Sequence, residues 1–425
     1  ALSANCGDNN TAIGSGALNA TTGTDNTAVG KDAGVAVTSG VENTLIGKSA
    51  GDALTDADYN VAMGSSALTS DTLGSRSVAI GQEALSNQNF TTATDTYNTA
   101  VGFLAGKLVT TGSQNTLIGG LAGDAITTGD YNVAFGRSAL STNTASNTNV
   151  AIGGQSLADF NVTTDTDTHN VAVGYATGAA MTTGVLNTLI GGLAGDALTT
   201  ADENVTVGYN SLSTNTKSFY NVAVGSRSLA AHNISSADTA GYNTAVGTAA
   251  GAAITTGINN TLIGGLSGDL MTTGNNNVGV GISSISGGTV TGNDNTGVGS
   301  AAGFALSSGI NNSFFGHDAG RTGSPGGNIT SANNTIVLGD DNVGACHIQT
   351  DWTVASDQRD KTDFTALDLG LDFVKALAPV TYKWDKRSKY GDKTADDYDL
   401  AAQTPDGTHK EDWLDIGFKA QAVQA

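Results

Sequence analysis

Residues 98–119 read NTAVGFLAGKLVTTGSQNTLIG and contain two copies of one five-residue pattern. Each copy starts with Asn, ends with an apolar residue followed by Gly, and carries Ala or Leu at its third position. The copies begin at Asn98 and Asn115, 17 residues apart. A short apolar segment closed by Gly is typical of a strand, and a strand of this length is not stable alone. Its burial must therefore come from neighbouring copies.

The same pentapeptide recurs through the first 340 residues. It starts at Asn10, Asn26, Asn43, Asn60, Ser77, Asn98, Asn115, Asn132, Asn149, Asn170, Asn187, Asn204, Asn221, Asn243, Asn260, Asn277, Asn295, Asn312 and, in a stretched copy, Asn334. Most intervals are 17 residues, and nearly every fourth lengthens to 21 or 22. Such repeats predict a solenoid with one coil per copy. About 19 coils stacked about 4.8 Å apart would make a rod about 90 Å long.

The pattern within the pentapeptide predicts both the fold class and an assembly. Gly closes every copy and Thr-Thr-Gly recurs between copies, which disfavours helices. The third residue is usually Ala or Leu and the fourth is Val, Ile, Met or Phe, so both faces of the strand are apolar. A single solenoid buries only one of them. We therefore predict an all-β, elongated parallel β-solenoid or β-roll that assembles as a parallel homotrimer.

Composition and charge exclude several classes of protein. Gly accounts for 58 of 425 residues without a three-residue period, and Pro for only 3, which excludes collagen. Residues 1–350 carry 8 Lys or Arg against 24 Asp or Glu, so a nucleic-acid partner is not expected. No stretch approaches 18 consecutive apolar residues, so membrane insertion is not expected. No zinc-ligand spacing or phosphate loop is present, and we predict neither a metal nor a cofactor.

The repeats also resemble a known family. The stretch GSRSVAIGQEAL at residues 74–85, with the recurring Asn-x-Ala-Val/Ile-Gly, is similar to the head repeats of trimeric autotransporter adhesins. The resemblance covers about residues 8–340 and implies a trimeric left-handed parallel β-roll. It keeps a cellular adhesin or surface filament open as an alternative function.

The last 70 residues have a different composition and a different resemblance. All three Pro and all three Trp lie after residue 324. Apolar spacing predicts a short helix over 368–377, and alternation predicts a strand in VTYKW at 380–384. This segment resembles the start of the intramolecular chaperone domain of phage tail spikes and fibres, also called the peptidase S74 domain. The matching positions are Ser356, Asp357, Arg359, Lys361, Pro379, Tyr382, Trp384, Gly417, Phe418, Ala420, Gln421 and Val423.

The second resemblance implies trimerisation of the fibre and, often, release by cutting the bond before the Ser. Here that bond is Ala355–Ser356. Ser356 would be the nucleophile, Lys361 its base, and Asp357 would position or assist, an arrangement of serine–lysine catalysis. In the alternative, Ser356 and Asp357 cap a turn and Lys361 is solvated. No enzyme acting on a separate substrate is expected.

Three segments follow from these patterns. Residues 1–340 form the shaft, 341–355 a linker, and 356–425 a small α+β segment that opens the chaperone domain. Near-identical repeats can pair one coil out of register, and three chains multiply the wrong alignments. A C-terminal clamp that fixes the register before the shaft forms would remove that problem.

The longer intervals supply the candidate recognition residues. Insertions at about 82–97, 154–169, 226–242 and 317–333 should project from one edge of the shaft, where binding loops usually lie. Their ring side chains are candidate receptor contacts, and in the alternative they pack the loops onto the wall: Phe90, Tyr97, Phe160, His169, His232 and Tyr242. Asp165 and Asp167 beside His169 match no calcium loop and are interpreted as a solvated turn.

The functional prediction is a virion-surface fibre for host attachment. Its partners would be two further copies of itself, a host cell-surface glycan or protein, and other tail or fibre proteins of the virion. A tail-spike glycan depolymerase is the second hypothesis, because related chaperones occur on such enzymes and glycan hydrolysis uses paired carboxylates. Against it, the shaft carries only three Glu, namely Glu42, Glu83 and Glu203.

Overall fold

The computed structural model describes residues 2, 6–234, 239–347, 379–385, 390 and 402–417. The chain divides into two compact units, residues 1–346 and 347–425. The first unit holds the repeats and is called the shaft below. The finer boundaries expected at residues 340 and 355 stay predictions.

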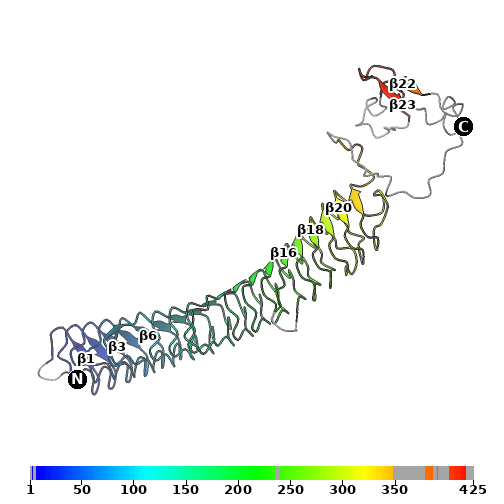
Figure 1. Cartoon of the computed structure of the whole chain (residues 1–425). Coiled ribbons are helices and arrows are strands. Elements are labelled where there is room, and N and C mark those ends of the chain that lie inside the picture. Colours follow the sequence, from blue (N-terminus) through cyan, green and yellow to red (C-terminus); the bar gives the residue numbers. More distant parts are fainter. Residues whose placement is uncertain are drawn as a thin grey trace. The chain divides into compact units, whose positions relative to one another are not determined.

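The shaft is built on one 19-stranded parallel sheet, whose strands follow one another in chain order along the rod (Figure 1). The strands are β1 (Thr11–Ile13), β2 (Thr27–Val29), β3 (Thr44–Ile46), β4 (Val61–Met63), β6 (Val78–Ile80), β8 (Thr99–Val101), β9 (Thr116–Ile118), β10 (Val133–Phe135), β11 (Val150–Ile152), β12 (Val171–Val173), β13 (Thr188–Ile190), β14 (Val205–Val207), β15 (Val222–Val224), β16 (Thr244–Val246), β17 (Thr261–Ile263), β18 (Val278–Val280), β19 (Thr296–Val298), β20 (Ser313–Phe315) and β21 (Ile336–Leu338). Each strand pairs in register with the same three positions of the next coil. The predicted parallel β-solenoid of about 19 coils is confirmed.

One predicted repeat start is wrong by a single residue. Eighteen strands begin directly after the predicted first residue of the pentapeptide, whereas β21 begins two residues after Asn334. The backbone N–H of Thr335 donates to the Asn312 side chain at 3.0 Å, the bond that Asn residues make elsewhere. Thr335 therefore takes the place of the Asn in the last coil, because the extra residue of NTIVLG is accommodated before the strand.

The sequence has a longer period of four coils in addition to the single-coil repeat. The packing of the interior explains it. Side chains from the middle of each strand fill it, as fully buried Ala100 and Leu117 do. Where the corner after the strand is Gly, as at Gly106, an apolar residue three positions later, Val109, completes the filling. A Cβ at Gly106 would lie 2.7 Å from a methyl carbon of Leu117. From β2 to β17, coils with Gly at this corner therefore alternate in pairs with coils that place a Leu there, and a single coil with Ile285 follows.

Two further repeated features come from stacking. The Asn that opens each pentapeptide accepts a bond from the backbone N–H of its neighbour one coil on, as between Asn98 and Asn115 at 2.9 Å. Its amide group also donates to a corner carbonyl, so the Asn side chains form a ladder of amides along the coils. The closing Gly adopts φ near +140° at Gly102, where a Cβ would lie 2.5 Å from the carbonyl oxygen of Gly119. Only Gly fits this position.

The insertions pair with the coil before them. β5 (Gly74–Ser75) and β7 (Thr94–Asp95) form a short parallel pair at the first insertion. Isolated parallel bridges Asn147↔Asp167 and Phe219↔Ala240 repeat this arrangement at the second and third. Backbone pairing therefore holds the inserted residues to the coil before them.

The second unit contains an antiparallel pair of strands in its described part. β22 (Val380–Tyr382) pairs with β23 (Asp415–Gly417), which confirms the strand predicted in VTYKW. The helix predicted over 368–377 lies outside the described residues. Among the residues that are described, no helix has the length and apolar character needed to cross a membrane.

Candidate binding surfaces of the shaft

The side of the sheet that points away from the interior is apolar along the whole shaft. From β2 to β21 the middle residue of every strand in the sheet is buried, whereas the first and third residues never are. We call these first and third strand residues the outer face. Its large exposed members are Ile13, Met63, Phe135, Ile190, Val205, Ile263, Val298, Phe315, Ile336 and Leu338. Parallel sheets are normally covered on both faces, and a continuous apolar strip of this length marks an interaction surface.

A second surface runs along the corner before the strands. The residue preceding each pentapeptide has a left-handed backbone conformation, with φ between about 47° and 63°. Its N–H donates to a carbonyl of the preceding coil, as from Tyr131 to Ser113 at 3.1 Å, which holds this conformation in residues other than Gly. We call these residues the corner row. Its central part consists of Tyr59, Arg76, Tyr97, Gln114, Tyr131, Thr148, His169, Leu186, Glu203, Tyr220 and Tyr242.

Side chains of the corner row contact one another from coil to coil. The Arg76 guanidinium lies 4.6 Å from the centre of the Tyr59 ring, and its Nε lies 3.1 Å from an oxygen of Asp95. Gln114 donates to the Tyr131 hydroxyl at 2.9 Å. The row is therefore an ordered surface of rings and polar groups, and not a set of independent side chains.

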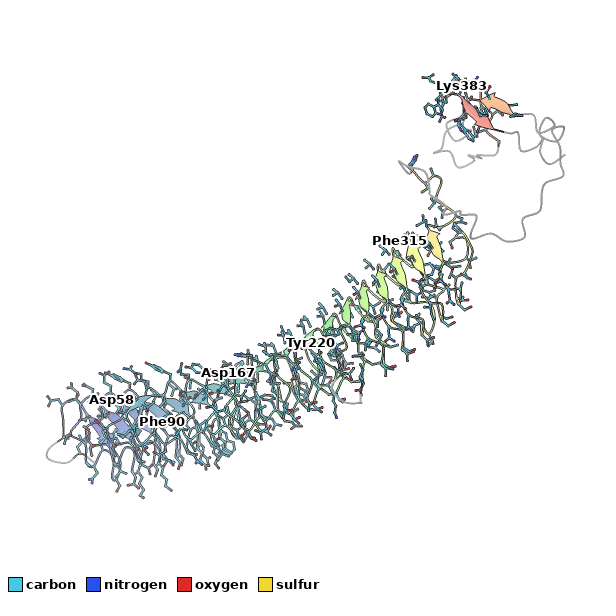
Figure 2. All side chains as sticks on the ribbon, viewed as in Figure 1. Asp58, Phe90, Asp167, Tyr220, Phe315 and Lys383 are labelled. Atoms are coloured by element: carbon cyan, nitrogen blue, oxygen red, sulfur yellow. The ribbon has the colours of Figure 1, made fainter. Side chains whose placement is uncertain are left out.

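The two Tyr residues at the far end of this region stack directly. The rings of Tyr220 and Tyr242 lie 5.2 Å apart at an interplanar angle of 14°. Glu203, one coil earlier, raises the pKa of the Tyr220 hydroxyl by its charge. Figure 2 shows side chains along the whole shaft, with Tyr220 of the corner row and Phe315 of the outer face labelled.

The six ring residues predicted as receptor contacts divide into two groups. Tyr97, His169 and Tyr242 are exposed, and each is the corner-row residue of its coil. Phe90, Phe160 and His232 are buried in the shaft and cannot contact a receptor. The insertion tips themselves carry exposed Thr and Asp, as at 163–167, and no rings. For the buried three, the alternative interpretation holds, in which rings pack the insertions onto the wall.

Insertion coils use these buried positions to complete the interior. Gln88, Phe160 and His232 occupy equivalent places, each three residues after the corner Leu. Gln88 Nε2 donates to Ser77 Oγ at 2.8 Å, and its Oε1 accepts from Asn98, so it replaces the amide missing at Ser77. A polar insertion residue can therefore repair the ladder of amides.

His232 lies in the equivalent place but makes fewer hydrogen bonds there than Gln88 does. Its Nε2 lies 3.2 Å from Ser218 Oγ, whereas its Nδ1 is buried without a hydrogen-bond partner. Burial lowers the pKa of the imidazole from 6.5 to about 4. The side chain is thus held neutral at physiological pH, and its protonation would oppose folding.

Acidic groups near the insertions are engaged in local contacts. Asn147 Nδ2 donates to Asp165 at 2.8 Å and to Asp167 at 3.3 Å, which ties the second insertion to the coil before it. Lys107 lies 2.9 Å from Glu83 and lowers the pKa of that carboxyl group. These contacts give both acidic sites a structural role.

In the second unit, the strand pair joins two separate blocks of sequence. Register places Val380 opposite Gly417 and Tyr382 opposite Asp415. The rings of Tyr382 and Trp384 make an edge-to-face contact at 5.4 Å. Ser356, Asp357 and Lys361, the candidate cleavage residues, lie outside the described residues.

These two blocks lie within a recognised domain. Residues 356–425 match the Peptidase_S74 family, described as the chaperone of endosialidase. Such a chaperone domain behind a β-solenoid shaft fits a phage tail fibre with an intramolecular chaperone. No curated protein matches the chain.

The corner row was missed as a whole by sequence reasoning. Tyr59, Tyr131 and Tyr220 belong to it but lie in or before coils of ordinary length, so the search for insertions passed over them. The signal was available, because each directly precedes a pentapeptide. The cluster of His317, Asp318 and Asp340 at the end of the shaft gave no signal in the sequence.

Proposed function

We propose that the protein is a virion fibre whose shaft is a parallel homotrimer packed through the outer face, and which attaches the particle to a host cell. The observation that carries the proposal is the uncovered apolar outer face, present in every coil of the sheet. The match of residues 356–425 to a chaperone family that implies trimer formation supports it independently. A fibre of this type is extracellular or virion-associated.

The energetics favour association through this face. A half-exposed Val or Ile gains about 1 kcal/mol when the rest of its area is buried. The third strand residue is apolar in every strand of the sheet, and the first is Val or Ile in nine of them. Burial of about twenty such side chains would contribute up to about 20 kcal/mol per chain, which exceeds the cost of association of about 4–15 kcal/mol. Aligned coils of identical chains place apolar rows of equal length against one another. A parallel threefold arrangement uses the whole face.

The assembly is tested on the full chain and on a chain that ends at residue 355. Size-exclusion chromatography with light scattering should give three times the chain mass for the full protein. The shortened chain should give aggregate or monomer, because nothing sets the register of its repeats. Soluble trimers formed readily without residues 356–425 would contradict the chaperone role, and a monomeric full chain would contradict the trimer.

Self-cleavage at Ala355–Ser356 is a separate part of the proposal. Ser356 Oγ would attack the carbonyl carbon of Ala355 while Lys361 takes its proton, and the peptide C–N bond would break to leave an ester on Ser356 Oγ and a free amine on Ser356. Water would then hydrolyse the ester and separate residues 1–355 from 356–425. Mass spectrometry of the purified product should find the fragment ending at Ala355, and Ser356→Ala should keep the chain intact. An uncleaved wild-type chain would leave the segment as a chaperone without protease activity.

Attachment is assigned to the corner row, because its exposed rings contact neighbouring corner-row side chains from coil to coil. Weak contacts repeated along the shaft and in three chains would add up through multivalency. Tyr97→Ala combined with Tyr131→Ala should lower binding to host cells at least tenfold. Tyr175→Ala is the control, since Tyr175 is 64% exposed and lies outside the row. Equal binding by both variants would remove the corner row from attachment.

The purified trimer also tests the depolymerase hypothesis. Trimer incubated with host polysaccharide should release no oligosaccharide if the shaft only binds. Released oligosaccharide would replace the binding function by an enzymatic one, and the carboxylates responsible would then have to be sought by substitution. Detection of the protein on cells and not in purified virions would favour the cellular adhesin.

A further inference from the structure

The last two coils of the shaft bring together three side chains that can bind a metal ion. They are His317, Asp318 and Asp340, and their ligand atoms lie within 4.8 Å of one another. In the pairing of β20 with β21, Phe315 lies opposite Leu338. His317 and Asp340 each follow two residues later, so they are adjacent on consecutive coils. The sequence shows no such site, because 23 residues separate the two.

The distances suit a tetrahedral ion. His317 Nδ1 lies 3.3 Å from Asp340 Oδ2 and 3.5 Å from Asp318 Oδ2. Bonds of about 2.0–2.2 Å from a zinc ion to nitrogen and oxygen place neighbouring ligand atoms about 3.4 Å apart. The nitrogen thus already lies at nearly this separation from each of the two oxygens, and the oxygens lie within 4.8 Å of one another. A water molecule would supply the fourth ligand.

Neighbouring groups orient both carboxylates. Arg321 Nη1 donates to Asp318 Oδ1 at 2.5 Å, which leaves Asp318 Oδ2 toward the imidazole. The backbone N–H of Asn342 donates to Asp340 Oδ1 at 3.0 Å, and its side-chain amide reaches Oδ2 at 3.1 Å. Arg321 is itself held 4.6 Å above the ring of Phe304. Such outer contacts are what fixes ligands in metal sites.

We propose that His317, Asp318 and Asp340 bind one divalent transition-metal ion, with zinc preferred, and that the ion fastens the last coil to the one before it. An imidazole nitrogen with two carboxylates suits zinc and related ions, whereas calcium prefers oxygen ligands alone. In the described part of the shaft no strand stacks beyond β21, so the last coil pairs with a neighbour on one side only, and the ion would add a contact on that side.

The experiment uses the untagged full chain freed of metal with a chelator. Titration calorimetry with zinc chloride should give one site per chain, and His317→Ala and Asp340→Asn should each weaken binding at least tenfold. Cobalt(II) in place of zinc should give the visible absorption of a tetrahedral site in the wild type and lose it in both variants. His317 is exposed, so the substitutions leave the interior of the coil intact.

His169→Ala is the matched control, because His169 is also exposed and lies beside Asp165 and Asp167. It should bind zinc as the wild type does. Three results would overturn the proposal: no zinc binding by the wild type, equal loss in His169→Ala, or calcium binding in the absence of zinc binding. A rise in thermal midpoint with zinc in the wild type and not in His317→Ala would support the fastening of the last coil.

Discussion

The interior and the outer face of the shaft lie on opposite sides of the same strands, and both are apolar, yet they are built differently. Interior positions hold mostly Ala or Leu, and the shaft's own chain buries them. Outer-face positions hold mostly Val, Ile or Thr, with Met, Phe, Leu or Ser in a few coils, and these residues remain partly or largely exposed. The interior is thus closed within one chain, whereas the outer face requires another surface. One repeat encodes a fold and an assembly at once.

Of the changes that test this difference, introducing charge into the outer face should have the largest effect, because it should prevent the trimer from forming. Ile118→Lys combined with Ile190→Lys would place two ammonium groups per chain in a face that the trimer removes from water. An unpaired buried charge costs several kcal/mol, so the substitutions should abolish the trimer. Light scattering of the purified variant measures the mass.

The matched control places the same charges on the solvated side of the coil. Thr128→Lys combined with Thr183→Lys changes two exposed corner residues and should leave the trimer intact. A trimer in both variants would show that the outer face is not the interface. Loss of the trimer in both would trace the effect to net charge.

A pair of adjacent truncations compares the two faces directly. Leu117 points into the interior and is fully buried, and Ile118 belongs to the outer face. Leu117→Ala should destabilise by about 2–5 kcal/mol per chain, the usual cost of a large cavity. If copies of the chain cover the outer face, Ile118→Ala should cost nearly as much, measured as a shift in the thermal or urea midpoint. A cost near zero for Ile118→Ala would mean that this face is open to solvent.

The fold could be predicted from the sequence because the repeat makes every coil an independent observation of the same strand. Asn98 and Asn115 open copies that agree on where the strand and its closing Gly lie, and only the last copy, at Asn334, was displaced by one residue. The candidate site was harder to predict, because the sequence does not show which positions of an insertion are buried. Phe160 and His232 each lie three residues after a corner Leu, in the place that Val109 takes after Gly106, and the structure shows that this place faces the interior.

The corner row was not predicted from the sequence, for a different reason. A Tyr with positive φ is rare, so neither Tyr59 nor Tyr131 signals such a corner by its residue type. The conformation is imposed by the hydrogen bond to the preceding coil, which exists only after stacking. The position of these residues before each pentapeptide is visible in the sequence, whereas their backbone conformation depends on the stacked coils.

The smallest expected effect concerns His232, because protonation of this side chain adds only one proton to the interior. Its pKa is lowered to about 4 in the fold, against 6.5 for an exposed imidazole. The unfolded chain therefore binds more protons than the folded chain between these values, and stability falls as the pH falls from about 6.5 to 4. At pH 5 the loss is about 2 kcal/mol per chain relative to pH 8. Thermal midpoints at the two pH values measure it.

His232→Phe should remove this loss, because Phe160 already occupies the equivalent place in another insertion coil. The difference between the midpoints at pH 8 and pH 5 should then be smaller in the variant than in the wild type, while carboxyl groups contribute equally to both. His169→Gln removes an exposed imidazole and should leave the difference unchanged. Parallel pH profiles for wild type and His232→Phe would mean that the imidazole is solvated in the assembled shaft. The interior would then be open at the insertion coils, and the contrast between a closed interior and an uncovered outer face would fail there first.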